Sequence, residues 1–352
     1  MSATFSENDR RCMSRALALA RTRLGRTSPN PAVGAVLWKK GKVIGEGRHL
    51  RAGRPHAEVE AVRDARRRGH SSKGATLYVT LEPCSTCGRT PACTDLIRRE
   101  EIARVVVAAK DPNPHHAGAG FRILKKAGIE VAHGLFAKES AALNRAFNKW
   151  IVTGLPWVTA KIALSLDGGI APREGDDRWL TSAAARRQAH RLRLEADAVV
   201  VGGTTARRDN PRLTVRLGRE GAGKTQPWRI VWSKGGRPFD RSLHLFSDVH
   251  RDRTRVVRGG TLAALLAGLG GEGVTHVLIE GGGGVLGEAF REGVVDEAAF
   301  FLAPVMLGRG TEVPALAPAL LLPTGRLDVA LEDAIFTKLG PDLLCQARVI
   351  TR

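Results

Sequence analysis

Apolar residues recur at helical and strand spacing in turn along the first 150 residues. Leucines and alanines at helical spacing predict a helix over residues 8–24, and VGAVLWKKGKVIGEG predicts two strands joined by a tight Lys-Gly turn. Six segments then alternate between helix and strand: HAEVEAVRDARRRG, ATLYVTL, ACTDLIRRE, ARVVVAA, GFRILKKAG and IEVAHG. This alternation predicts a three-layer α/β domain.

A second series of strands begins after a Gly-Leu-Pro break. The helix predicted for ESAALNRAFNKW ends at TGLPW, which places a domain joint near residues 150–156 and predicts domains over 1–150 and 151–352. At 352 residues the chain exceeds one ordinary core, which also favours two domains. The strand candidates of the second half are WVTAKIAL, DAVVVGG, WRIVW, THVLIE, AAFFLAPVML and DLLCQARVI. The last two suggest an α/β sheet closed by antiparallel strands.

Composition narrows the class of protein. The apolar stretch ALAPALLLP is short and interrupted by prolines, so no membrane span is expected. The start MSATFSENDRRC has no apolar segment after a basic one, so we expect no signal peptide and a cytoplasmic protein. Three of the five cysteines lie within ten residues, and a reducing compartment leaves such thiols free to bind metal.

The chain is strongly basic, with 55 Lys and Arg against 35 Asp and Glu. The basic residues are spread over helical patterns and indicate solvated faces. One tyrosine and 5% aromatic residues offer few stacking platforms for a nucleic-acid strand. We therefore interpret the charge as attraction for anionic small molecules, phosphorylated ones included, and expect no nucleic-acid partner.

Two short stretches carry candidate metal ligands. PHAEVEA holds His56 and Glu58 at the start of a predicted helix, and TLEPCSTCGRTPAC holds Cys84 after a strand and Cys93 at the start of the next helix. One imidazole and two thiolates fill three corners of a tetrahedral Zn²⁺ site and leave the fourth for water, which is the catalytic arrangement. Glu58 is then the candidate general base that passes the proton of the water to the leaving amine.

Cys87 leaves the ligand set open. It gives C-x-x-C spacing with Cys84, so the pair Cys84 and Cys87 is an alternative to Cys84 and Cys93. Gly88 and Pro91 interrupt the chain between Cys87 and the next helix and favour Cys93. All three thiolates with His56 would instead close the shell and make the zinc structural.

The pattern H-A-E with E-P-C is similar to the zinc nucleobase deaminases. With SPNPAVGAV, GEGRHLRAGRPHAEVEA, GRTPACTDLI and DPNP, the first half resembles the deaminase half of the bifunctional riboflavin-biosynthesis deaminase-reductases. The resemblance implies a cytidine-deaminase-like fold, His56, Cys84 and Cys93 as zinc ligands, and Asn30, His49 and Arg89 as contacts to the pyrimidine or its ribose phosphate. That family usually has His two residues after the first cysteine, whereas this chain has Thr86 at that position.

A glycine-rich turn in THVLIEGGGGVLGEAF is the second candidate site. Gly282, Gly284 and Gly287 satisfy G-x-G-x-x-G between a strand and a helix, where backbone amides can approach a diphosphate. A purely structural turn is the alternative. Only about 65 residues follow, too few for the rest of a Rossmann sheet, so we expect phosphate binding without that fold.

The second half resembles the reductase half of the same family, on AKIALSLDGGIA, DDRWLTSAAARR, ADAVVVGGTTARRDNPRLTVR and IEGGGGVLGEAF. The resemblance implies a dihydrofolate-reductase-like fold and NADPH as hydride donor. It implies these cofactor contacts: Ala163, Trp179, Thr205, Asp209, Gly282, Gly283, Gly284, Val285, Leu286, Gly287 and Glu288. It implies these contacts to the substrate: Asp177, Arg193, Leu213, Arg216 and Glu280.

Further residues of this half are predicted from their chemistry. Lys161 and Asp167 are candidate catalytic groups that orient a ribose near the nicotinamide, and Arg193 and Arg216 can pair with a phosphate. Asp177 stands where the family often has a small hydroxyl residue, and IVWSKGG leaves Ser233 as the candidate for a serine contact to the cofactor. For Arg186, Arg187 and Arg191 we expect a solvated helix face.

The resemblance spans both halves in order and implies two consecutive steps of riboflavin synthesis. These are zinc-dependent deamination of 2,5-diamino-6-ribosylamino-4(3H)-pyrimidinone 5′-phosphate and NADPH reduction of its ribosyl group to ribityl. A nucleic-acid base deaminase with an added binding domain is one alternative. A monofunctional descendant with a structural zinc is another, and a homo-oligomeric state is left open.

Overall fold

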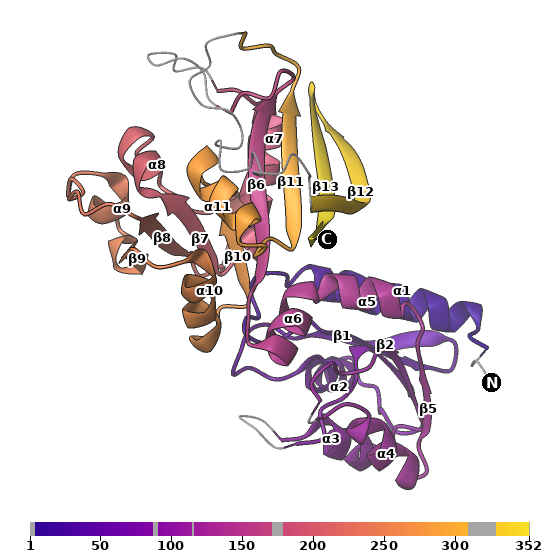
Figure 1. Cartoon of the computed structure of the whole chain (residues 1–352). Helices are drawn as coiled ribbons and strands as arrows, with labels where there is room; N and C mark the ends of the chain where they lie inside the picture. Colours follow the sequence, from indigo (N-terminus) through magenta and orange to yellow (C-terminus); the bar gives the residue numbers. More distant parts are fainter. Residues whose placement is uncertain (1–3, 87–90, 115, 171–178, 309–328, 352) are drawn as a thin grey trace. The chain divides into compact units, whose positions relative to one another are not determined.

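The computed structural model describes residues 4–86, 91–114, 116–170, 179–308 and 329–351. It separates into two compact units, Met1–Gly154 and Leu155–Arg352 (Figure 1). Each unit has its own sheet, with helices on both faces. The fold is therefore α/β in both halves, as predicted.

The first unit has a five-stranded sheet in the order β2-β1-β3-β4-β5. The strands are β1 (Gly34–Lys39), β2 (Lys42–Arg48), β3 (Thr76–Leu81), β4 (Arg104–Ala109) and β5 (Glu130–His133). β1 is antiparallel to β2 and β3, whereas β3, β4 and β5 run parallel. The predicted hairpin turn has positive φ at Lys40 (48°) and Gly41 (81°), the backbone of the two-residue turns that match strand twist.

Helices cover both faces of this sheet. They are α1 (Glu7–Arg21), α2 (Ala57–Arg67), α3 (Cys93–Arg99), α4 (Ala119–Lys126), α5 (Ala137–Leu143) and α6 (Arg145–Thr153). α1 packs on the face that carries Val36, Tyr78 and Val106, while α2, α3 and α4 cover the opposite face. Because side chains alternate along a strand, neighbouring residues of one strand enter the two cores. This is the three-layer arrangement expected from the sequence.

The helix predicted over ESAALNRAFNKW is wrong in one respect, because two helices meet at Asn144. The Asn144 side chain is buried; its Oδ1 accepts from the Ala32 N–H at 2.8 Å and its Nδ2 donates to the Ala32 carbonyl at 3.0 Å. The side chain thus provides hydrogen-bond partners for the backbone N–H and carbonyl of a residue 112 positions away. Helical periodicity does not reveal such a contact.

The second unit has an eight-stranded sheet in the order β12-β13-β11-β6-β10-β7-β8-β9. The strands are β6 (Trp157–Ser165), β7 (Ala198–Gly202), β8 (Trp228–Ser233), β9 (Thr254–Arg258), β10 (His276–Ile279), β11 (Glu297–Ala303), β12 (Val329–Leu339) and β13 (Asp342–Thr351). β13 is antiparallel to β11 and β12 is antiparallel to β13, which confirms the expected antiparallel closure. β11 itself is parallel to β6.

The helices of this unit lie on both faces of its sheet. They are α7 (Ala183–Glu195), α8 (Gly203–Arg208), α9 (His244–Ser247), α10 (Leu262–Gly271) and α11 (Gly283–Arg291), with short 3₁₀ helices at η1 (Gly218–Gly221) and η2 (Arg251–Arg253). α10 and α11 pack against one face, and α7 and α8 against the other. The carboxyl ends of β6, β10, β7 and β8 therefore meet along one edge, where ligands bind in open α/β sheets.

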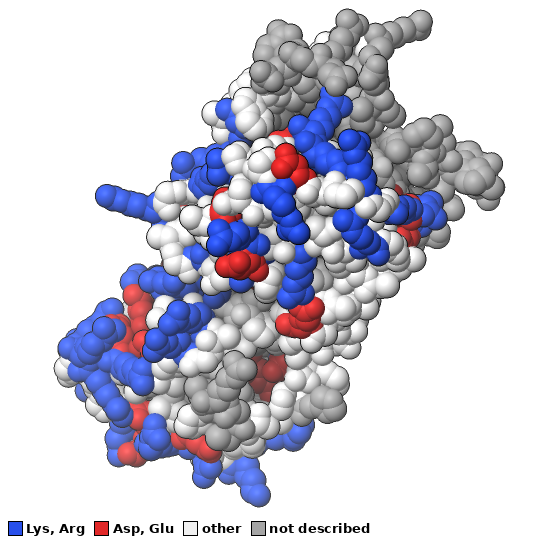
Figure 2. All heavy atoms as spheres, turned by 90° about the vertical axis from the view of Figure 1, so that its left-hand side faces the viewer, with Lys and Arg blue, Asp and Glu red and all other residues white. Residues whose placement is uncertain are grey.

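The surface is basic but mixed. Figure 2 shows acidic side chains lying between the Lys and Arg side chains of one face. On α7, Arg187 and Arg191 both pair with Glu220, at 3.0 and 2.7 Å, and all three groups are solvent-accessible. Within the described part of the chain, no helix combines the length and apolarity needed to cross a membrane.

Candidate functional site

Three potential metal ligands converge at one end of the first sheet. His56 immediately precedes α2, Cys84 follows β3, and Cys93 is the first residue of α3. The His56 Nδ1 lies 3.5 Å from the Cys84 Sγ and 3.4 Å from the Cys93 Sγ, and the three ligand atoms lie within 4.8 Å of one another. One nitrogen and two sulfurs at this spacing fit a zinc ion. Cys87 lies outside the described residues.

Neighbouring groups favour the thiolate form of Cys84. The hydrogen bond from the Cys93 side chain lowers the pKa of Cys84; burial opposes this shift, and His56 adds to it. The Cys93 backbone N–H also donates to the Cys84 Sγ at 3.2 Å. Because metals bind the thiolate, these contacts favour the ligand form of Cys84.

Glu58 is buried beside this cluster, in the first turn of α2. Burial raises the pKa of its carboxyl group, and the charge of Cys84 raises it further, while His56 opposes the shift. A carboxyl group whose pKa is raised holds a proton more readily than a free one, as a group that accepts and returns a proton must. The structure therefore brings the four predicted deaminase residues together.

His49 and Asn30 form a hydrogen-bonded pair next to the cluster. The His49 Nδ1 lies 3.1 Å from the Pro55 carbonyl, so this nitrogen carries the proton and donates. Its Nε2 accepts from the Asn30 Nδ2 at 3.1 Å, and its ring meets that of His56 edge to face at 5.4 Å. Burial lowers the pKa of His49, which favours the neutral ring that this bonding requires.

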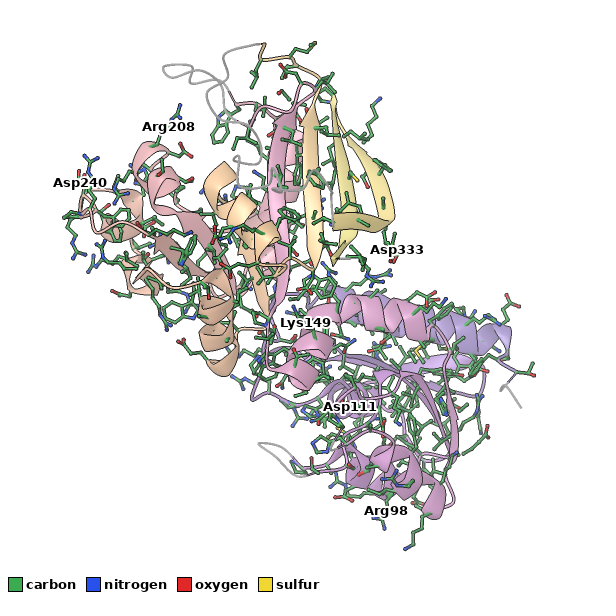
Figure 3. The ribbon with its side chains drawn as sticks, viewed as in Figure 1. Arg98, Asp111, Lys149, Arg208, Asp240 and Asp333 are labelled. Atoms are coloured by element: carbon green, nitrogen blue, oxygen red, sulfur yellow. The ribbon has the colours of Figure 1, made fainter. Side chains whose placement is uncertain are left out.

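A cavity of about 270 Å³ opens beside the cluster. Its lining residues are Asn30, Pro31, Val33, His49, His56, Glu58, Leu81, Glu82, Cys84, Thr86, Asp111, Asn113, His116 and Phe147. Sequence reasoning assigned no role to Asp111, labelled in Figure 3, to Asn113 or to His116. Asp111 and Asn113 belong to the DPNP motif that follows β4, whereas His116 lies two residues beyond that motif. Burial raises the pKa of Asp111. Arg89, a predicted substrate contact, lies outside the described residues.

Glu82 ties the segment after β4 to this cavity. Its buried carboxylate accepts hydrogen bonds from the backbone N–H groups of Asp111 (3.2 Å), Gly118 (2.9 Å) and Gly120 (3.0 Å). A Cβ at Gly120 would lie 2.4 Å from the Pro83 carbonyl oxygen, so only glycine fits there. One carboxylate thus holds both ends of the segment that carries His116.

In the second unit, Arg193 and Glu280 form a buried pair. Arg193, on α7, donates to both carboxylate oxygens of Glu280, which follows β10; the Nη2–Oε2 distance is 2.8 Å. Burial alone would raise the pKa of Glu280, but Arg193 and Lys161 outweigh it and the pKa lies below its ordinary value. Burial lowers the pKa of Lys161, on β6, and Glu280 opposes this. The structure therefore brings Lys161, Arg193 and Glu280 together.

His190 and Arg216 extend this group. The Arg216 backbone N–H donates to the His190 Nδ1 at 3.3 Å, and the Arg216 Nη1 donates to the Thr214 Oγ1 at 3.3 Å. Burial lowers the pKa of His190 to about 4, aided by the charges of Arg193 and Arg216. Leu213 is buried at φ 51°, a conformation that costs a non-glycine residue about 1–2 kcal/mol. Sequence reasoning did not select His190, because one imidazole in an arginine-rich helix carries no motif.

The glycine-rich turn joins β10 to α11 as predicted. The Gly282 N–H donates to the Thr205 Oγ1 at 3.1 Å, and a Cβ at Gly281 would lie 2.8 Å from the Val285 Cβ. Val285 and Leu286 point into the core, so only their backbones can face a ligand. The absence of side chains over Gly282–Gly284 and the first amides of α11 fit a dinucleotide diphosphate.

The other predicted cofactor residues are distributed over several segments of the second unit. Ala163 is on β6, Ser233 ends β8 and is buried, and Asp209 follows α8. Glu288, on α11, pairs with Lys234 at 3.1 Å. Trp179 is exposed, with the Arg186 guanidinium 5.0 Å from its ring centre. Asp177, a predicted substrate contact, lies outside the described residues.

Asp167, a predicted catalytic group, makes structural contacts. It lies on the turn after β6 and is exposed. Its two carboxylate oxygens accept from the backbone N–H groups of Leu307 (3.1 Å) and Gly308 (2.8 Å). A hydrogen bond from Ser165 and these two N–H groups lower its pKa to about 2. Asp167 therefore connects the turn after β6 to the segment after β11, and any contact that it makes with a ligand would come in addition to these hydrogen bonds.

Comparisons with known families cover both units. Residues 156–345 match the RibD C-terminal domain, and residues 6–109 match the cytidine and deoxycytidylate deaminase zinc-binding region. The riboflavin biosynthesis protein RibD of Bacillus amyloliquefaciens is 40% identical over 359 residues, covering 94% of each chain. That of Escherichia coli K12 is 39% identical over 324 residues, covering 84% of this chain and 88% of the relative.

Solved structures agree with these matches. RibD of Acinetobacter baumannii (form 1) aligns with a TM-score of 0.87 and 35% identity, over 98% of this chain and 99% of that one. A Thermotoga maritima protein described as a diaminohydroxyphosphoribosylaminopyrimidine deaminase/5-amino-6-(5-phosphoribosylamino)uracil reductase aligns with a TM-score of 0.86 and 32% identity, over 97% and 99%.

Proposed function

The chain belongs to the RibD family, and we infer that it is a bifunctional enzyme of riboflavin biosynthesis, with a zinc-dependent deaminase and an NADPH-dependent reductase in one polypeptide. We propose that it first deaminates 2,5-diamino-6-ribosylamino-4(3H)-pyrimidinone 5′-phosphate and then reduces the ribosyl group to ribityl. The observation that carries the proposal is the convergence of His56, Cys84 and Cys93 beside buried Glu58, in a chain that also matches the reductase domain.

In the deaminase, His56, Cys84 and Cys93 would hold zinc, which when bound supplies an acidified water as nucleophile. Glu58 accepts a proton from the nucleophile at its carboxylate and donates it to the exocyclic amine, which leaves as ammonia. The raised pKa of Glu58 supports both transfers, because the carboxyl can hold the proton between them.

Binding of the pyrimidine falls to polar groups of the cavity wall. Asn30 is oriented by the hydrogen bond from its Nδ2 to the His49 Nε2, while His49 is itself fixed by its Nδ1–H bond to Pro55. We propose that Asn30 and His49 position the ring so that the carbon bearing the amine faces Glu58. Arg89 is proposed as a partner of the ribose phosphate.

In the reductase, NADPH when bound supplies a hydride to C1′ of the ribosyl group. We propose that Gly282–Glu288, Thr205, Asp209, Ala163, Trp179 and Ser233 hold this cofactor. Lys161, Arg193 and Glu280 would orient the sugar and its phosphate, together with Arg216, Leu213, Asp177 and Asp167. The Arg193–Glu280 pair supports this assignment, because it fixes a guanidinium and a carboxylate beside Lys161.

Three further proposals concern the setting of the enzyme. The partner is a phosphorylated small molecule, in keeping with the net charge of +20. A cytoplasmic location suits thiolate ligands, which a reducing compartment keeps unoxidised. A homo-oligomeric state also remains a proposal, to be tested by light scattering of the purified protein.

A coupled assay tests the function. Purified protein is supplied with the phosphorylated diaminopyrimidine and NADPH, and ammonia release is followed together with the loss of NADPH absorbance. One ammonia per NADPH consumed is expected. Ammonia without NADPH oxidation would leave only the deaminase, and neither signal in zinc-loaded protein would overturn the proposal.

A further inference from the structure

The deaminase cavity contains an imidazole to which the reaction as described assigns no role. We propose that His116 binds the 5′-phosphate of the deaminase substrate. The proposal rests on the proposed deaminase function and deepens it by naming a phosphate-binding side chain. His116 is half-buried in the segment after β4 and lines the cavity beside Asp111 and Asn113.

The backbone around His116 is held in place. The His116 N–H donates to the Asn113 carbonyl at 3.0 Å, and the His116 carbonyl accepts from the Ala119 N–H at 2.8 Å. On either side of it, the Glu82 carboxylate binds the N–H groups of Asp111 and Gly118. The ring is therefore presented from an anchored turn, which lowers the entropy cost of a contact to substrate.

Among the three imidazoles that line the cavity, His116 is the one with ring nitrogens available. His56 belongs to the metal cluster, and both ring nitrogens of His49 are engaged, with Asn30 and Pro55. Within the described part of the chain, the ring of His116 makes no hydrogen bond to another residue. Thr86, on the same cavity, offers only a hydroxyl group.

Charge favours phosphate as the partner of this ring. The cavity is lined by the carboxyl groups of Glu58, Glu82 and Asp111, so a substrate dianion needs cations nearby to enter it, and Arg89 is proposed above as one of them. An imidazole can supply one by protonation. Two further cations flank the same turn, because a Cβ at Gly118 would lie 3.5 Å from the Lys110 Nζ and 3.6 Å from the Arg122 Nη1.

The test compares four variants of the full-length, zinc-loaded protein: His116→Ala, His116→Gln, His116→Arg and, as a control, His70→Ala, whose histidine lies outside the cavity lining. The steady-state constants of ammonia release are measured with the phosphorylated diaminopyrimidine. Loss of a charge-assisted hydrogen bond predicts a KM about tenfold higher for His116→Ala and His116→Gln, with kcat nearly unchanged. His116→Arg should restore KM to within about threefold of the parent protein, because it replaces the cation.

Two measurements separate this proposal from the function on which it rests. Zinc content and NADPH oxidation with the deaminated intermediate should be the same in all four variants, since both depend on other residues. An unchanged KM in His116→Ala overturns the proposal, as does restoration by His116→Gln, which would indicate a neutral contact to the ring. An equal rise in all three His116 variants would also overturn it. If the parent protein releases no ammonia, the deaminase function itself fails.

Discussion

Glu82 gives the sharpest prediction about the deaminase, because one buried carboxylate accepts three backbone hydrogen bonds. Glu82→Gln keeps the shape of the side chain but replaces one oxygen by an NH₂ group. With its remaining oxygen toward Asp111 and Gly118, the new side chain turns its NH₂ toward the N–H of Gly120. At least one hydrogen bond to a charged acceptor is lost and two donors face each other.

The loss of one such hydrogen bond costs about 1.5–3 kcal/mol, and the unpaired Gly120 N–H adds to this cost. We therefore expect Glu82→Gln to lower the free energy of unfolding of the first unit by about 3 kcal/mol. For a unit of this size, that corresponds to a fall of about 6–12 °C in the midpoint of unfolding. Deamination should also weaken, because Asp111, Asn113 and His116 lie on the segment that Glu82 holds against the cavity.

The assay uses the two activities as separate reporters. Samples are heated at a series of temperatures, and residual ammonia release and residual NADPH oxidation are measured on each. Glu82→Gln should lower the half-inactivation temperature of the first activity and leave the second unchanged. Glu139→Gln, the same charge change at an exposed residue of α5, is the control. A shift below about 1 °C with full deamination, or equal loss of both activities, would refute the reasoning.

Three further predictions concern the metal, the buried pair and pH. Cys93→Ser should lose zinc and deamination while Cys87→Ser keeps both, as measured by metal analysis and ammonia release; equal loss in the two variants contradicts the ligand assignment. Glu280→Gln should raise the KM of the reduction at least tenfold and leave deamination unchanged, because Arg193 and Lys161 lose their buried counter-charge; an unchanged KM argues against it. The folded-state pKa of His190, about 4, lies below its ordinary value of 6.5, so its stabilising contribution is complete above pH 6.5 and is lost as the pH falls toward 4. His190→Gln should therefore reduce the difference in half-inactivation temperature of NADPH oxidation between pH 7 and pH 5, and an unchanged difference would show that another group is responsible.

Much of the architecture could be predicted because it depends on the local periodicity of apolar and polar residues. Strand and helix periodicity predicted both α/β units, since each element buries one stripe or face. The order strand, glycines, helix at residues 276–291 was recoverable for the same reason. The motifs around His56, Cys84 and Cys93 identified a zinc chemistry before any geometry was known, because few other uses bring an imidazole, an acid and thiols to that spacing.

Other features depend on contacts between distant parts of the chain. The predicted helix divides at Asn144, whose side chain is hydrogen-bonded to Ala32, 112 residues away. Glu280 pairs with Arg193, 87 residues away in the sequence. Glu82 binds the backbone N–H groups on both sides of His116 and so holds that segment beside the cavity. None of these pairs has a periodicity or motif of its own. The sequence by itself determined the elements and the chemistry of the site, because both arise from neighbouring residues. Only the tertiary structure decided which buried polar groups pair, because each must find a partner wherever the fold supplies one.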